Sequence, residues 1–148
     1  MDDLIAFLRA RIDEDEQVAR GGNRGPWEIE RWDALGGPAA HVLMPLGDGA
    51  QTGLTRSALL GTHDAETMEH IARWDPARAL AEVEAKRRIL EDYRITASAV
   101  TRIEREGSAE PYWQDVGYQK LVAGRDAFKA AVRALAKVYT SHPDYPEG

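Results

Sequence analysis

The spacing of apolar residues predicts a mainly helical chain. Hydrophobic side chains recur every three, four or seven positions, the interval that keeps them on one face of an α-helix. The first predicted helix covers about residues 2–20, where an aspartate can cap the start and two glycines stop the end. Its apolar positions are Ile5, Leu8, Ile12 and Ala19.

A proline separates the next two predicted helices, which cover about residues 64–74 and 76–106. The residue before a proline is disfavoured in a helix, whereas proline itself suits the first helical position. Asp75 is therefore the expected N-cap of the helix that Pro76 begins. The apolar seam of that longer helix consists of Ala79, Val83, Leu90, Tyr93, Ala97 and Val100.

A last helix is predicted over about residues 114–139, after a short turn. Its apolar seam consists of Leu121, Phe128, Val132, Leu135 and Tyr139. Two long helices joined by a short turn are expected to pack antiparallel.

Between the first helix and the proline the pattern changes to alternation. The segments WEIERW and AAHVLMPL flank the turn ALGGP, which predicts a β-hairpin at about residues 26–45. Residues 46–62 are predicted as a loop and residues 140–148 as an extended tail. The expected fold is α+β and predominantly α: an antiparallel helical bundle with two long C-terminal helices and a small hairpin after the first helix.

Composition narrows the classes of function. The chain has 148 residues, the size of one compact domain, so we expect a single domain over residues 1–148. Its net charge of -6 makes general nucleic-acid binding unlikely. It contains no cysteine, no signal-peptide pattern and no stretch of about 18 apolar residues. We therefore expect a cytoplasmic protein that does not associate with a membrane.

No catalytic motif is present, so the sequence leans against an enzyme and assigns no catalytic residue or cofactor. The nearest candidate for a metal site is His63, Glu66 and His70. A structural or catalytic zinc site needs three or four converging ligands, and this run lacks the arrangement of an HExxH helix. We expect no metal.

Two sets of residues are candidates for ligand binding. His70, Arg73 and Arg78 surround the Pro76 junction, where free helix amides and two arginines could hold an anion such as a nucleotide phosphate. The structural alternative is favoured, because Asp75 as a cap already occupies that helix N-terminus.

The second set lies on the predicted hairpin, where Arg24, Trp32 and His41 could form a stacking site for a base or peptide. Trp27 is expected in the core, since large aromatic side chains are usually buried in domains of this size. Trp32 is the better candidate for an exposed platform.

Several segments carry a resemblance to known proteins: the opening DDLIAFLRARIDEDE, Gly25-Pro26-Trp27, HIARWDPAR from His70, and the closing HPDY from His142. They resemble a family of small uncharacterised proteins from actinobacteria, their phages and integrated mobile elements. The resemblance implies no activity and no catalytic residue, but it implies a phage or mobile-element setting.

The functional expectation is therefore a small accessory protein that binds a host or phage protein partner, with self-association through the long helices as a further option. The first alternative is a protein that binds or sequesters a nucleotide or another anion. The second is a DNA-associated protein that uses a basic helix face formed by Lys86, Arg87 and Arg88.

Overall fold

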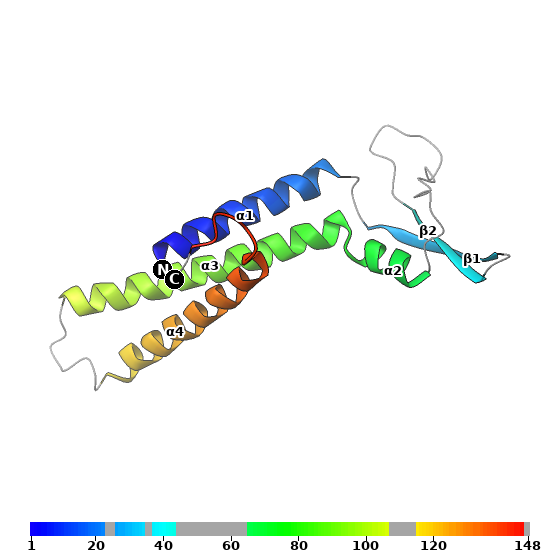
Figure 1. Cartoon of the computed structure of the whole chain (residues 1–148). Coiled ribbons are helices and arrows are strands. Elements are labelled where there is room, and N and C mark those ends of the chain that lie inside the picture. Colours follow the sequence, from blue (N-terminus) through cyan, green and yellow to red (C-terminus); the bar gives the residue numbers. More distant parts are fainter. Residues whose placement is uncertain (23–25, 35–36, 44–64, 107–114, 147–148) are drawn as a thin grey trace. The chain divides into compact units, whose positions relative to one another are not determined.

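The computed structural model describes residues 1–22, 26–34, 37–43, 65–106 and 115–146 (Figure 1). The elements in chain order are α1 (Asp2–Gly21), β1 (Glu28–Ala34), β2 (Gly37–Leu43), α2 (Ala65–Arg73), α3 (Pro76–Glu106), α4 (Val116–Ala136) and the 3-10 turn η2 (Lys137–Tyr139). The predominantly helical class is confirmed. The predicted loop at 46–62 lies outside the described residues.

The bounds of α3 agree with the prediction at both ends, because its start is set by local chemistry. Pro76 begins the helix, and the Asp75 carboxylate accepts a hydrogen bond from the Arg78 backbone N–H at 2.8 Å. This bond satisfies one of the amides that a helix N-terminus leaves without an intrahelical partner. The predicted cap is confirmed.

The strands reach further into the predicted turn than expected. β1 and β2 pair antiparallel in a register that runs from Glu28 opposite Leu43 to Ala34 opposite Gly37. Pro38 lies within β2 and does not disrupt the pairing, since a two-stranded sheet has open edges at which proline is tolerated. The hairpin itself stays a prediction.

The described chain forms two compact units. Unit 1 comprises Met1–Ile12 and Glu84–Gly148, and unit 2 comprises Asp13–Val83. Each unit has buried apolar side chains of its own. The single-domain organisation stays a prediction.

In unit 1, α3 and α4 lie side by side (Figure 1). Near the start of α4, the Tyr118 hydroxyl donates to Glu104 at 2.8 Å, and beyond its end the Lys86 ammonium donates to the Tyr139 hydroxyl at 3.1 Å. These two contacts join α4 and the residues after it to separate turns of α3. The fully buried side chains of unit 1 include Leu8, Ile12, Val100 and Val132.

The C-terminal segment folds back instead of extending as expected. The backbone N–H of His142 donates to Tyr139 O, and that of Tyr145 donates to His142 O, so two successive turns present three rings at three-residue intervals. All three rings meet the edge or face of Phe7 on α1, with centroids 5.5–6.2 Å apart. Burial of an aromatic side chain supplies the driving force for this tail conformation.

A second, smaller core lies in unit 2, where α2 packs on the strand pair. It consists of Ala40, Val42, Met68 and Ala72, with the partly buried Trp27, Ile29 and Ile71 packed against it. Trp27 thus belongs to this core, as its residue type predicted. Among the residues that the structure describes, no helix is long and apolar enough to cross a lipid bilayer.

Candidate functional site

The junction between α2 and α3 is tied to the first strand by a buried carboxylate. Asp75 is only 6% exposed, and its Oδ2 accepts a hydrogen bond from the Trp27 backbone N–H at 2.9 Å. Its other oxygen caps α3. One of the free amides that could have attracted an anionic ligand therefore already has a negatively charged partner, and that carboxylate disfavours an incoming anion.

The two arginines proposed for anion binding at this junction each contact a carboxylate. Arg73 is paired with Glu69 at 3.1 Å, and Arg78 with Glu82 at 3.0 Å. Glu69 also accepts from Arg31 of β1 at 2.9 Å. Both arginines lie at the junction, but each is paired with a carboxylate that an incoming anion would have to displace.

An aromatic residue that the sequence reasoning missed lies between these groups. The Trp74 ring is 49% exposed, with the Arg78 guanidinium 4.2 Å from its centroid and the His70 ring 6.2 Å away. The one-turn spacing of His70, Trp74 and Arg78 is the signal that could have found it. An exposed indole with a cation on one face is a surface on which a planar ligand can stack.

The other predicted ligand residues are placed only in part. Trp32 lies opposite Ala39 and His41 opposite Glu30 in the strand register, and their side chains lie outside what the structure describes. Arg24 and His63 are both outside the described residues. The stacking site on the hairpin therefore stays a prediction.

The basic face on α3 is engaged in contacts within unit 1. Lys86 bonds the Tyr139 hydroxyl and lies 5.6 Å from the centre of that ring, and Arg88 pairs with Asp92 at 3.2 Å. Arg87 is half-buried. These contacts leave fewer free cations for a phosphate backbone than the sequence suggested.

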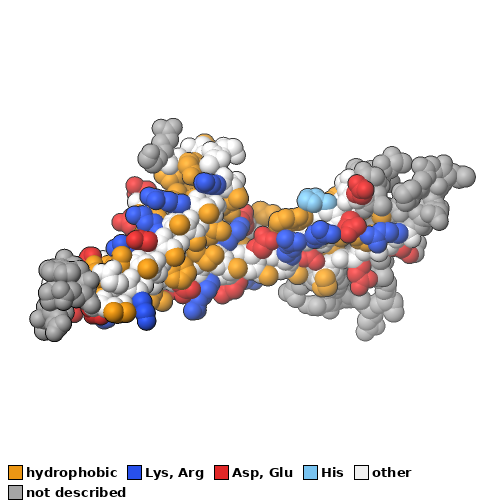
Figure 2. Space-filling model, turned by 90° about the horizontal axis from the view of Figure 1, so that it is seen from below, with side chains coloured by type: hydrophobic (Ala, Val, Ile, Leu, Met, Phe, Trp, Pro, Cys, Tyr) orange, Lys and Arg blue, Asp and Glu red, His pale blue; other side chains and the backbone are white. Residues whose placement is uncertain are grey.

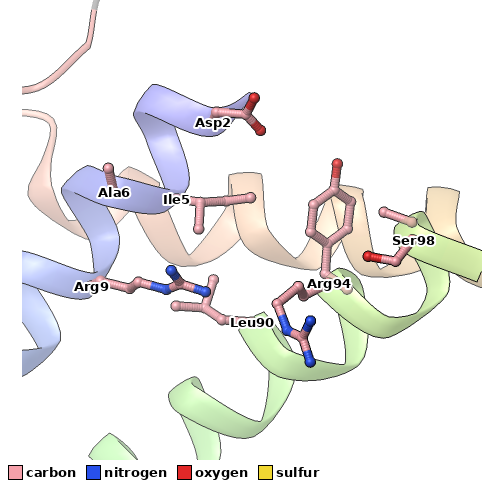
Figure 3. A pocket seen from close by; sticks show the side chains of 9 residues that line it. Asp2, Ile5, Ala6, Arg9, Leu90, Arg94 and Ser98 are labelled. Carbon is pink, nitrogen blue, oxygen red and sulfur yellow. The ribbon is translucent and has the colours of Figure 1, made fainter. Parts of the chain in front are cut away.

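A groove between α1 and α3 is a concave surface of unit 1 (Figure 3). Its volume is about 390 Å³. Aliphatic and aromatic side chains from both helices line it: Ile5, Ala6, Leu90, Tyr93 and Ala97. Small alanines on facing helices leave room between the larger side chains, and this is why a groove forms at this position.

Charged side chains surround this apolar floor. Asp2 and Arg9 come from α1, and Arg94 comes from α3 (Figure 3). Arg94 makes two hydrogen bonds to Glu91, at 2.9 and 2.6 Å. These bonds and the charge of Arg94 lower the pKa of the Glu91 carboxyl, with smaller contributions from Arg9 and Arg88.

The lowered pKa of Glu91 makes the stability of the folded state depend on pH. A carboxyl whose pKa is lower in the folded state contributes stability above its unfolded pKa, and loses it as pH falls through the folded pKa. Both partners of the pair are solvent-exposed, so the contribution is small and confined to acidic pH.

Apolar side chains also reach the surface of unit 1. Figure 2 shows hydrophobic side chains gathered in a band along the long helices, with charged side chains at its edges. Large exposed hydrophobic residues on these helices and just beyond them are Ile95, Val116 and Val138, each at least half exposed. Exposed apolar side chains bordered by charged ones are typical of protein interaction sites.

Taken together, the described residues form a small helical protein with an apolar groove and no grouping of three His, Asp or Glu placed to hold a metal. Residues 1–148 match the model of a family of unknown function (DUF6221), and the chain belongs to that family. Comparison with curated proteins found no match, and comparison with solved structures found none either.

Proposed function

We propose that this protein acts by binding a protein partner through the groove between α1 and α3. The observation that carries this proposal is the groove itself, with an apolar floor and opposite charges at its rim. An amphipathic helix laid in such a groove buries its apolar face and pairs its polar residues with the rim. The apolar band in Figure 2 provides additional contact area.

The setting of this role is also a proposal. It is that of a cytoplasmic accessory protein of an actinobacterium, its phage or a mobile element, whose partner is a host or phage protein. In this proposal the three long helices form an antiparallel bundle that serves as the scaffold, and the β1–β2 pair is a hairpin appended to it. The two contacts that join α3 to α4 and the residues after it, together with the register of the strands, support this architecture.

Filling the groove is expected to abolish partner binding. Ala6 is exposed and lines the groove, so Ala6→Trp places a large ring where the partner side chain would lie. Affinity purification from the source cells, quantified by mass spectrometry, should show at least about a tenfold loss of the main partner, the effect typical of a blocked interface centre.

Ala127→Trp is the matched control, because Ala127 is an exposed helical alanine of α4 that does not line the groove. This variant should retain the partner. Equal recovery with both variants would refute the groove as the binding site. If the occupant is a second copy of the chain, light scattering after size-exclusion chromatography will show a dimer for the natural sequence and a monomer for Ala6→Trp.

A second candidate function is favoured by the exposed Trp74 ring. We infer that a nucleotide could stack its base on the ring, with Arg73 and Arg78 exchanging their carboxylate partners for phosphate oxygens. A ligand that binds only the folded state raises the melting temperature.

Addition of millimolar ATP or GTP is therefore expected to raise the melting temperature by several degrees, and Trp74→Ala or Arg73→Ala should remove the shift. The control is Arg20→Ala, since Arg20 pairs with Glu16 at one-turn spacing as Arg73 pairs with Glu69. The absence of any nucleotide-dependent shift would eliminate this candidate.

A further inference from the structure

Three cations follow one another at one-turn spacing on α4 and at the first residue of η2. They are Lys129, Arg133 and Lys137, and successive positions lie about 6 Å apart along the helix axis. Within the described part of the chain, none of the three side chains has a hydrogen bond, ion pair or ring contact. We refer to them as the α4 basic row.

Carboxylates that could pair with the α4 basic row are plentiful in the chain. The chain has 25 acidic and 19 basic residues, so carboxylates outnumber cations. Elsewhere in unit 1, Arg88 pairs with Asp92 and Arg94 with Glu91. The attraction of cations to a helix C-terminus falls off within the last turn, so it explains Lys137 and not Lys129 two turns earlier.

The basic row borders a hollow of about 470 Å³. The other walls come from the two ends of the chain: Leu4 from α1, and Tyr145 and Pro146 from the C-terminal segment, all half-buried. Asp3 is the one carboxylate among the residues that line it. The hollow therefore combines an excess of positive charge with walls suited to an apolar side chain.

We propose that the α4 basic row and this hollow bind an acidic segment of a partner protein that carries one apolar anchor residue. The inference rests on the proposed function, since it names the chemistry of the partner. Carboxylates at one-turn spacing on a partner helix would match the three cations, and an apolar side chain between them would enter the hollow.

A nucleic acid is a poorer match for the same surface. Three cations neutralise only a few phosphates of a long backbone. An apolar wall of Leu4 and Pro146 offers nothing to a phosphate, whereas it gains free energy by covering a hydrophobic side chain.

The test is selection from a displayed library of random 15-residue peptides on the full chain, followed by titration of the selected peptides by fluorescence anisotropy. We expect enrichment of peptides with several Asp or Glu residues and at least one large apolar residue. The triple variant Lys129→Gln/Arg133→Gln/Lys137→Gln removes three charge pairs with the selected peptides. We expect it to bind these peptides about tenfold or more weakly.

The matched control is Lys120→Gln. Lys120 is exposed on α4, and nine residues before Lys129 it lies on the opposite side of the helix. This variant should change the affinity less than about twofold. Circular dichroism should be unchanged in all variants, because the substituted side chains are exposed or half-exposed.

Two further probes decide between partner classes. A 20-base-pair DNA duplex and inorganic tripolyphosphate are titrated under the same conditions. The acidic-peptide assignment would be overturned if either probe bound more tightly than the selected peptides do and if that binding were lost in the triple variant. Selection of peptides without acidic residues, or no selection at all, would also overturn it. Ala6→Trp leaves this surface intact, so loss of the groove partner alone would not affect the peptide result.

Discussion

Phe7→Ala is expected to lower the free energy of unfolding of unit 1 by about 3–5 kcal/mol, the usual cost of truncating a buried aromatic side chain. The ring of Phe7 is only 8% exposed and contacts Tyr139, His142 and Tyr145 edge to face. Its removal leaves a cavity and takes away the surface on which the C-terminal segment folds.

The same substitution is also expected to release that segment. His142 receives a hydrogen bond from the Arg11 guanidinium at 3.0 Å, and Arg11 lies 5.4 Å from the centre of the Phe7 ring. Loss of the ring therefore loosens the contact that joins residues 131 positions apart. Hydrogen exchange at the Tyr145 and His142 amides should accelerate more than at α3 amides.

Urea unfolding followed by circular dichroism measures the stability change. Val18→Ala is the control, because Val18 is on the same helix but 78% exposed, and its replacement should change stability by less than about 0.5 kcal/mol. A loss below about 1 kcal/mol for Phe7→Ala would show that the aromatic cluster is not a folded core.

The second large effect is expected at Asp75. Asp75→Ala removes the acceptor for two backbone amides, those of Trp27 and Arg78. Each part-buried N–H left without a partner costs about 1–3 kcal/mol, so we expect a loss of about 2–6 kcal/mol for unit 2.

Asp115→Ala separates the tie to Trp27 from ordinary helix capping. Asp115 caps α4 and is exposed, and its carboxylate accepts a hydrogen bond from the Gly117 amide at 2.7 Å. Its loss should cost about 1 kcal/mol, the typical value for an N-cap. The stability loss of Asp75→Ala beyond that of Asp115→Ala is then the contribution of the hydrogen bond between Asp75 and the Trp27 amide.

Asp75→Asn provides a second measurement of the same bond. An asparagine keeps one acceptor oxygen but faces one of the two amides with an NH₂ group, which is also a donor. Its stability should therefore fall between that of the natural chain and that of Asp75→Ala, with a shift in Trp27 fluorescence. Equal losses for Asp75→Ala and Asp115→Ala would contradict the role of Asp75 as a tie between β1 and α3.

Some features of the candidate sites can be predicted from the sequence, and others cannot. The arginines beside Pro76 were predicted as ligand residues from residue type; the structure shows each in an ion pair, and their ligand role stays a prediction. That Glu69 and Glu82 pair with them follows from one-turn spacing and was within reach of the sequence. The link from Glu69 to Arg31 was not, because those residues are 38 positions apart.

The groove and the hollow could not have been predicted in the same way. Ile5 and Leu90 lie on separate helices, and nothing in their local sequences indicates that their neighbours Ala6 and Ala97 leave space between them. The row of cations on α4 is visible in the sequence, but its lack of carboxylate partners is a property of the folded surface. A sequence pattern shows which face of a helix is polar, and not what lies opposite it.

The sequence by itself determined the elements of this protein. Apolar spacing, the Asp75–Pro76 pair and alternation at residues 28–34 act over a few residues, so they can be recognised without tertiary contacts. Only the tertiary structure decided that Phe7 meets the C-terminal rings, that Asp75 binds the Trp27 amide, and that α1 and α3 leave a groove. These contacts join distant positions, and their free energy comes from burial and hydrogen bonds that exist only once the chain has folded.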